Sequence, residues 1–134
     1  MNKVLKIITR AIVIDQDKIL LVKKSDADFW HFPGGKWEFE NESLERAIQR
    51  ELIEETGYQI NPAKIIFTQE LRENKKVYLE LFWRAELTSI EQAPIAEDEE
   101  IQTHRWFTVA DLINQEVNFK PNNSTIADIL QSLT

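Results

Sequence analysis

A cluster of charged side chains at regular spacing is the part of this sequence best equipped to do chemistry. The stretch 50–55 reads Arg-Glu-Leu-Ile-Glu-Glu and holds three carboxylates beside one guanidinium. The chain has no cysteine, so the ligands in this stretch are all oxygen atoms. Clustered oxygen ligands suit a hard divalent cation, Mg²⁺ or Mn²⁺, which keeps some of its water and bridges to phosphate groups. The pattern therefore predicts a metal site that faces a phosphate-bearing ligand.

The glycines of the chain gather around the same cluster. There are only three, Gly34, Gly35 and Gly57, and they flank it on both sides. Glycine is the default residue where the backbone takes a positive φ or where another group must approach it closely. We therefore expect the chemistry to lie between Pro33 and Tyr58.

The charged cluster falls on the best helix candidate of the sequence, Ser43 to Thr56. Ser43 is a suitable N-cap, and Gly57 stands at the position of a C′ glycine. The helical period places Glu51 and Glu55 on the apolar stripe that must dock on a sheet. An unpaired buried carboxylate costs several kcal/mol and rarely stays ionised. One arginine cannot neutralise three acids, so a bound cation is favoured over the alternative of a solvated helix end. The stripe consists of Leu44, Ala47, Ile48 and Leu52.

The remaining elements predict one layered α/β domain over residues 1–134, with helices packed on a mixed sheet. Two apolar runs flank the polar turn 15–17 and indicate a hairpin. Asn123-Ser124 can cap a final amphipathic helix. The expected strands are Leu5–Ile14, Lys18–Lys24, Lys36–Phe39, Ala63–Arg72, Lys76–Leu87 and Thr103–Phe107, and a short helix is expected at Val109–Asn114.

Composition excludes several classes of function. The net charge of −7 argues against non-specific binding to nucleic acid. No apolar run approaches the roughly 18 residues of a membrane span, so we expect no membrane partner and a cytoplasmic protein. The absence of cysteine excludes disulfides and a cysteine nucleophile. The acidic run 97–100 has two interpretations, a solvated loop or a loop that supplies ligands.

The charged helix and its lead-in closely resemble the Nudix box of the Nudix hydrolases. The resemblance rests on Gly35, Glu42 and the segment 50–58, preceded by the Phe-Pro-Gly-Gly-Lys-Trp-Glu passage at 32–38. In one departure, six residues separate Gly35 from Glu42. The family has five there, with a glycine just before the glutamate. Asn41 tolerates the left-handed backbone of such a turn, so we expect the turn to form.

The resemblance implies an α/β/α sandwich with a mixed sheet and Mg²⁺-dependent hydrolysis of a nucleoside diphosphate linked to another group. It implies that Glu51, Glu54 and Glu55 bind the metal together with the carbonyl of Gly35. Arg50 would orient the glutamates, and Glu42 would be an outer ligand or an anchor for the loop. The candidates for the general base are Glu54, Glu55, Glu97 and Glu100.

The resemblance implies a small nucleotide as the substrate, and the sequence only partly indicates which one. Aromatic residues that a base could stack on, or that pack in the core instead, are Phe29, Trp30, Trp37 and Phe119. Residues 72–74 lack the proline and tyrosine that mark two related subfamilies. This favours a nucleoside triphosphate, including a noncanonical one, over ADP-ribose or a nucleotide sugar. Two other hypotheses are a non-catalytic nucleotide-sensing module and a protein that only buffers divalent cations. Proteins of the family that the chain resembles are often homodimers, although the sequence reveals no interface.

Overall fold

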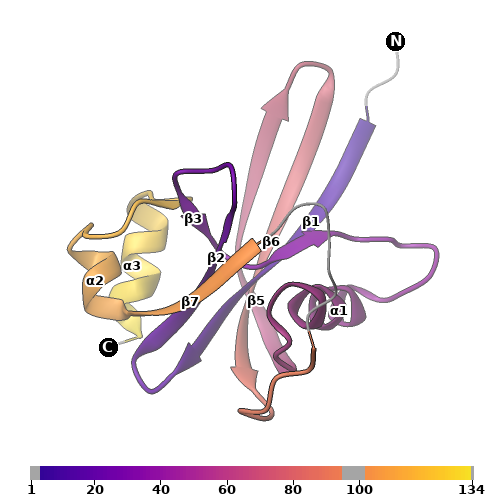
Figure 1. Cartoon of the computed structure of the whole chain (residues 1–134). Helices are drawn as coiled ribbons and strands as arrows, with labels where there is room; N and C mark the ends of the chain where they lie inside the picture. Colours follow the sequence, from indigo (N-terminus) through magenta and orange to yellow (C-terminus); the bar gives the residue numbers. More distant parts are fainter. Residues whose placement is uncertain (1–3, 95–101, 134) are drawn as a thin grey trace.

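The computed structural model describes residues 4–94 and 102–133. Figure 1 shows a curled mixed sheet with α1 on one face and α2 and α3 on the other. This confirms the expected α/β architecture. In chain order the elements are β1 (Val4–Asp15), β2 (Lys18–Lys24), β3 (Trp30–His31), β4 (Gly34–Lys36), α1 (Leu44–Thr56), β5 (Ile60–Glu73), β6 (Lys76–Leu87), β7 (Gln102–Thr108), α2 (Val109–Ile113), β8 (Phe119–Lys120) and α3 (Ser124–Ser132).

Strand β1 organises the sheet. It pairs in parallel with β6 and in antiparallel with β2 and β4. On the far side of β6 lies β5, and β7 and β3 pair with β2. The short strand β8 pairs in parallel with β3. The sheet therefore brings together segments from the whole described chain, and β4 carries Gly34 and Gly35 to the middle of β1.

The hairpin expected around residues 15–17 is confirmed. Gln16 and Asp17 have positive φ of 48° and 65°. Two successive residues with positive φ match the tight turn whose twist suits a two-residue hairpin. The turn also fixes the register, in which Ile14 faces Ile19 and Asp15 faces Lys18.

Alternating side chains of the sheet build a core on each face. Ile12 and Phe82 join the core under α2 and α3, whereas Ala11 and Trp83 join the core under α1. Strand β6 is thus covered on both faces over its buried middle, as its apolar composition predicts. Helix α1 contributes Ile48 and Leu52, both fully buried, and so is held rigidly against the sheet.

The structure differs from the sequence prediction at two short strands of the sheet. The strand expected at 36–39 instead spans Gly34–Lys36, because the two glycines pair with Thr9 and Arg10 of β1. The chain then turns at 39–41. Strand β8 was not predicted, because a two-residue strand shows no periodicity; it places Phe119 in the core.

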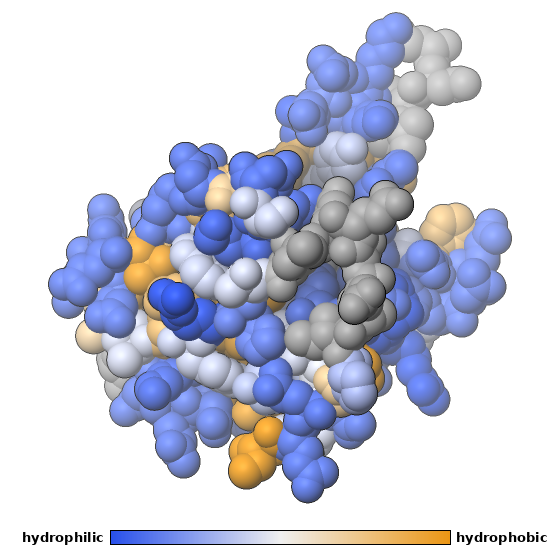
Figure 2. Space-filling model, viewed as in Figure 1, coloured by the Kyte–Doolittle hydropathy of each residue, from blue (hydrophilic) through white to orange (hydrophobic). Residues whose placement is uncertain are grey.

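Figure 2 shows one face of the molecule, which is mainly hydrophilic with a few scattered apolar patches. In the part of the chain that the structure describes, no helix has both the length and the apolar character needed to cross a bilayer.

Candidate active site

Helix α1 begins and ends as its sequence predicts. The Ser43 hydroxyl accepts a hydrogen bond from the backbone N–H of Arg46 at 3.2 Å, and Gly57 takes a left-handed φ of 77°. The Gly57 N–H then donates to the carbonyl of Ile53 at 2.9 Å and closes the last turn. With the apolar stripe docked on the sheet, the position of each glutamate is determined by its place on the helix.

Glu55 is the most buried of these glutamates, with 9% of the residue exposed. Its Oε1 accepts a hydrogen bond from the Gly34 N–H at 3.2 Å. Among the described residues nothing donates to its Oε2, although this atom is buried. Burial, and then the charge of Glu51, raise the pKa of the Glu55 carboxyl to about 8, and Arg10 opposes the shift. A buried anion with an unsatisfied oxygen calls for a nearby cation or a proton.

The carboxylate of Glu51 lies against the backbone of Gly35. A Cβ added to Gly35 would stand 2.5 Å from the Glu51 carboxyl carbon, so this glycine leaves room for the carboxylate. Burial raises the pKa of Glu51, while Arg50, 3.0 Å from its Oε1, works in the opposite direction. Glu51 and Glu55 therefore sit side by side at the Gly34-Gly35 backbone, as the helical period predicts.

Arg50 donates hydrogen bonds to three glutamates of the charged cluster. Its Nε and Nη2 donate to the two carboxylate oxygens of Glu42 at 2.9 and 2.7 Å, a bidentate pair. Its Nη1 donates to Glu51 and also to Glu54, at 3.2 Å from Oε2. These carboxylates raise the pKa of the guanidinium, and the hydrogen bond from Arg50 lowers that of Glu42.

The longer spacing between Gly35 and Glu42 is accommodated by Trp37. The indole Nε1–H of Trp37 donates to the carbonyl of Glu42 at 2.9 Å, and the Glu38 N–H donates to its carboxylate at 3.3 Å. Glu42 consequently reaches Arg50 despite the added residue. The chain turns at 39–41, but without the left-handed backbone expected at Asn41, which does not have a positive φ. Trp37 also makes an edge contact with Phe39, which is 68% exposed.

The glutamates suit a divalent cation in chemistry, but they do not yet form a complete cage. Within residues 4–94 and 102–133, no three acidic, histidine or cysteine side chains converge on one point. Glu54 is turned toward Arg50, although 52% of its side chain is exposed. The carboxylate oxygens of this cluster, including the unsatisfied Oε2 of Glu55, fit Mg²⁺ or Mn²⁺.

Two functional candidates were not singled out by the sequence patterns, Arg10 of β1 and Glu80 of β6. Arg10 Nε donates to Glu80 Oε2 at 3.1 Å, and Glu80 is 5% exposed. The signal available in the sequence was a charged residue inside each of two apolar strands. A charge on such a strand must be paired when it is buried.

The aromatic candidates for substrate contact lie in different surroundings. Phe119 is 1% exposed and packs against Phe32, so it offers a ligand almost no surface. Trp30 packs on Phe107 of the core beneath Arg105. Phe29 is half-buried, and the ammonium of Lys120 lies 4.6 Å from its ring centre. Phe29 and Trp30 both keep partial exposure, whereas the indole of Trp37 is committed to the carbonyl of Glu42.

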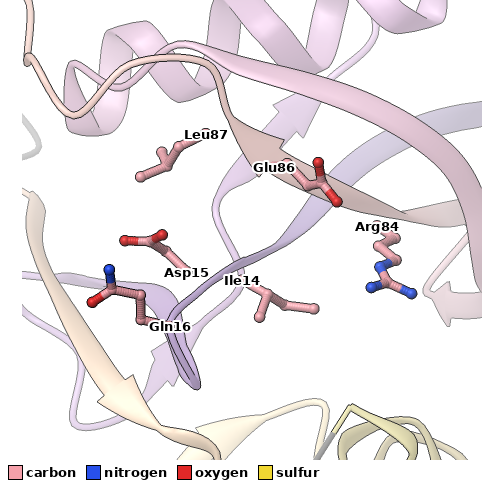
Figure 3. Close-up of a pocket in the computed structure, with 6 residues that line it drawn as sticks. All are labelled: Ile14, Asp15, Gln16, Arg84, Glu86 and Leu87. Atoms are coloured by element: carbon pink, nitrogen blue, oxygen red, sulfur yellow. The ribbon is translucent and has the colours of Figure 1, made fainter.

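A pocket that the structure describes lies away from this site and adds no ligand to it. Glu97 and Glu100 lie outside the described residues. Figure 3 shows the pocket, of about 260 Å³, between the 15–16 turn and the end of β6. It lies beyond the β1 residues that pair with β4. Its lining residues are Ile14, Asp15, Gln16, Arg84, Glu86 and Leu87.

Comparison with known proteins agrees with this geometry. The NUDIX domain family model matches residues 5–131. The chain is 31% identical over 126 residues to the uncharacterized Nudix hydrolase YvcI of Bacillus subtilis (strain 168), covering 92% of this chain and 77% of that one. It is 32% identical over 131 residues to the 8-oxo-dGTP diphosphatase of Buchnera aphidicola subsp. Schizaphis graminum (strain Sg), covering 91% and 90%. A NUDIX hydrolase structure from Nitrosomonas europaea has a TM-score of 0.76 at 22% identity, covering 96% of this chain and 88% of that chain.

The chain belongs to the Nudix hydrolase family. It is therefore a hydrolase that acts on phosphoanhydride bonds in small nucleotide substrates, and its family generally uses divalent metal cations.

Proposed function

We propose that the chain is a Mg²⁺-dependent pyrophosphohydrolase that cleaves a phosphoanhydride bond of a nucleoside triphosphate, including oxidised or otherwise noncanonical ones. The observation that carries this proposal is the adjacent pair of partly buried Glu51 and buried Glu55 at the Gly34-Gly35 backbone, in which one carboxylate oxygen of Glu55 has no donor among the described residues. Two adjacent carboxylates in such surroundings are costly to ionise without a cation. A catalytic metal gives a reason for that cost.

Glu51, Glu54 and Glu55 would hold the ion together with the carbonyl of Gly35. A bound divalent cation neutralises phosphate oxygens and lowers the pKa of coordinated water. Arg50 keeps Glu51 and Glu54 in place through charge-assisted hydrogen bonds. Glu54 is the best placed described carboxylate to take the proton of the attacking water, because its half-exposed side chain can turn away from Arg50. Glu55 is the second candidate, and the roles of Glu97 and Glu100 stay predictions.

The choice of a nucleoside triphosphate as the substrate class is supported by the name of a relative, not by a binding pocket. The Buchnera protein, which matches over nearly the whole of both chains, is named an 8-oxo-dGTP diphosphatase. This favours a nucleoside triphosphate over ADP-ribose or a nucleotide sugar. A non-catalytic nucleotide-sensing module is the alternative of a different class. It is disfavoured because a binding module has no need of the costly buried glutamates.

A substrate panel tests the proposal. Purified protein is incubated with Mg²⁺ or Mn²⁺ and with canonical and oxidised nucleoside triphosphates, ADP-ribose, nucleotide sugars and dinucleoside polyphosphates. Glu54→Gln and Glu55→Gln are run beside Glu45→Gln, an exposed glutamate on the same helix. Metal-dependent turnover of a triphosphate that is lost in the first two variants alone supports the proposal. Binding of nucleotides without turnover would instead favour the sensing module.

A further inference from the structure

Arg10 connects the sheet to the backbone of the candidate metal centre. Its Nη1 donates to the carbonyl of Gly34 at 3.3 Å and approaches that of Phe32 at 3.5 Å. Its Nε is held by Glu80, whose other oxygen accepts from Gln69 Nε2 at 2.7 Å. The guanidinium is therefore fixed from β6 and β5 while it reaches the glycine strand.

The peptide groups on both sides of Gly34 are held in this way. The carbonyl of Pro33 accepts from the Ala11 N–H at 2.9 Å, which fixes the peptide before Gly34. Arg10 holds the carbonyl of Gly34, which belongs to the peptide that leads into Gly35. The N–H of Gly34 is left pointing at Glu55, 3.2 Å from Oε1. The backbone that faces the glutamates is thus held by the pairing of β4 with β1 and, at the Gly34 carbonyl, by the Arg10 side chain.

We propose that Arg10, held in place by Glu80, is a positioning residue for the candidate metal centre: it fixes the Gly34–Gly35 peptide and thereby the backbone that faces Glu55 and Glu51. This inference rests on the proposed function for the metal that the centre would bind. Among the contacts described, Arg10 makes no hydrogen bond or ion pair with the glutamates of α1. Its charge acts on Glu55 through space, whereas its positioning effect is exerted through the Gly34 carbonyl.

The two contacts need an arginine. A planar guanidinium presents several donors in fixed directions, so it can bind a carboxylate through one edge and a carbonyl through another. A lysine carries one compact ammonium on a flexible stem and cannot reproduce this fork. We therefore expect Arg10→Lys to keep the charge beside Glu80 but to restore little of the positioning. Arg10→Met removes both contacts.

The small number of glycines makes the backbone directly observable. Selective ¹⁵N-glycine labelling gives an amide signal for each of Gly34, Gly35 and Gly57, the only glycines of the chain. We expect Arg10→Met to shift the signals of Gly34 and Gly35 and to leave Gly57, at the end of α1, unchanged. Glu80→Gln should shift the same two signals by less. The double variant should match Arg10→Met, because Glu80 acts through Arg10.

Metal affinity gives a second readout that does not require turnover. Titration with Mn²⁺, followed by the broadening of the same amide signals, should show an affinity about tenfold lower in Arg10→Met, the lower end of the usual effect of removing an outer partner of a metal site. The matched control is Arg72→Met. Arg72 pairs with Glu70 at 2.8 Å on the exposed β5, where both side chains are more than half exposed. We expect this change to alter neither signal nor affinity.

A purely structural role for Arg10 predicts a different result. Lower thermal stability of a folded Arg10→Met, with unmoved Gly34 and Gly35 signals, would overturn the inference. If Arg10→Met does not fold, Glu80→Gln is the deciding variant, because its amide retains a polar partner for both Arg10 and Gln69. Unmoved Gly34 and Gly35 signals in Glu80→Gln would also overturn the inference. If the wild-type protein hydrolyses no nucleotide, the proposed function fails, while the amide shifts still decide the role of Arg10.

Discussion

Gly35 and Glu51 are in such close contact that the glycine has no room for a side chain. A Cβ at Gly35 would stand 2.5 Å from the carboxyl carbon of Glu51 and 2.6 Å from both of its oxygens. The Gly35 backbone takes no positive φ, so conformational freedom does not explain this glycine. The space it leaves is filled by a carboxylate that we assign to the metal centre.

Gly35→Ala should therefore impair activity more than stability. The group that must move is the end of a flexible side chain, so the protein can fold with Glu51 displaced. We expect at least tenfold lower Mg²⁺-dependent turnover, in the range found when metal-site partners are disturbed. Steady-state kinetics beside thermal unfolding checks this. Turnover equal to that of the wild type would show that Glu51 is not required where it now lies.

Gly34→Ala should have the opposite balance of effects. Here a Cβ would meet the carbonyl oxygen of Thr9 at 1.9 Å, and the backbone φ is +150°. Neither obstacle can be relieved by turning a side chain, and strained backbone alone costs about 1–3 kcal/mol. We expect a loss of at least that much in the free energy of unfolding, measured by denaturant titration. A Gly34→Ala variant as stable as Gly35→Ala would contradict the strand register of β4.

Glu55→Gln should remove a pH dependence of stability in metal-free protein. The folded-state pKa of about 8 lies above the ordinary 4.5, so the folded protein keeps a proton that the unfolded chain releases. The stability this contributes is present below pH 4.5 and is lost as the pH rises toward 8, at about 1.4 kcal/mol per pKa unit. In EDTA, the unfolding temperature of Glu55→Gln should therefore rise relative to that of the wild type as the pH increases from 5 to 8.

Addition of Mg²⁺ provides the companion test. An ion that binds only the folded state raises its stability. We expect Mg²⁺ to raise the unfolding temperature of the wild type at pH 8 and to have little effect on Glu55→Gln. The control Glu45→Gln should respond as the wild type does. Equal shifts in all three proteins would remove Glu55 from the metal site.

Local signals made most of the fold and the glutamate helix predictable. Ser43 and Gly57 mark the ends of α1, and the helical period alone placed Glu51 and Glu55 on its docked face. The long hairpins were predictable for the same reason, because β-branched and aromatic residues surround short polar turns. These features depend on neighbours within a few positions along the chain.

The features that escaped prediction depend on distant partners. Arg10 and Glu80 are 70 positions apart, and the parallel pairing of Trp30 with Phe119 joins two very short strands. The glycine strand β4 has no strand propensity and exists because β1 accepts it as a neighbour. The sequence left open whether Phe119 contacts a base or packs in the core, and tertiary packing buries it.

His31 gives a second, independent pH dependence. Burial, assisted by the charge of Arg10, lowers its pKa to about 4 from 6.5. The unfolded chain therefore takes up a proton first, and stability falls as the pH drops from 6.5 toward 4, by about 3 kcal/mol at most. His31→Asn can still donate to the Phe32 carbonyl in place of Nδ1, and its free energy of unfolding should change less between pH 6.5 and 4 than that of the wild type. The same pH dependence in both proteins would show that the pKa of His31 is not lowered in the folded protein.

Arg50→Lys tests whether the guanidinium orients the glutamates or merely balances their charge. Lysine keeps the positive charge but cannot make the bidentate pair with Glu42, at 2.9 and 2.7 Å, while also holding Glu51 and Glu54. We expect turnover to fall about 10- to 100-fold, with a smaller change in KM, because the loss is in the orientation of groups that act on the reacting phosphate.

Arg46→Lys is the matched control, since Arg46 lies exposed one turn earlier on α1. Glu42→Gln should give a loss intermediate between the two, because its amide can accept from Arg50 through only one oxygen. Arg50→Lys with wild-type turnover would show that charge balance suffices. In that case Glu42 and its Trp37-anchored turn would serve the stability of the loop rather than the geometry of the metal centre.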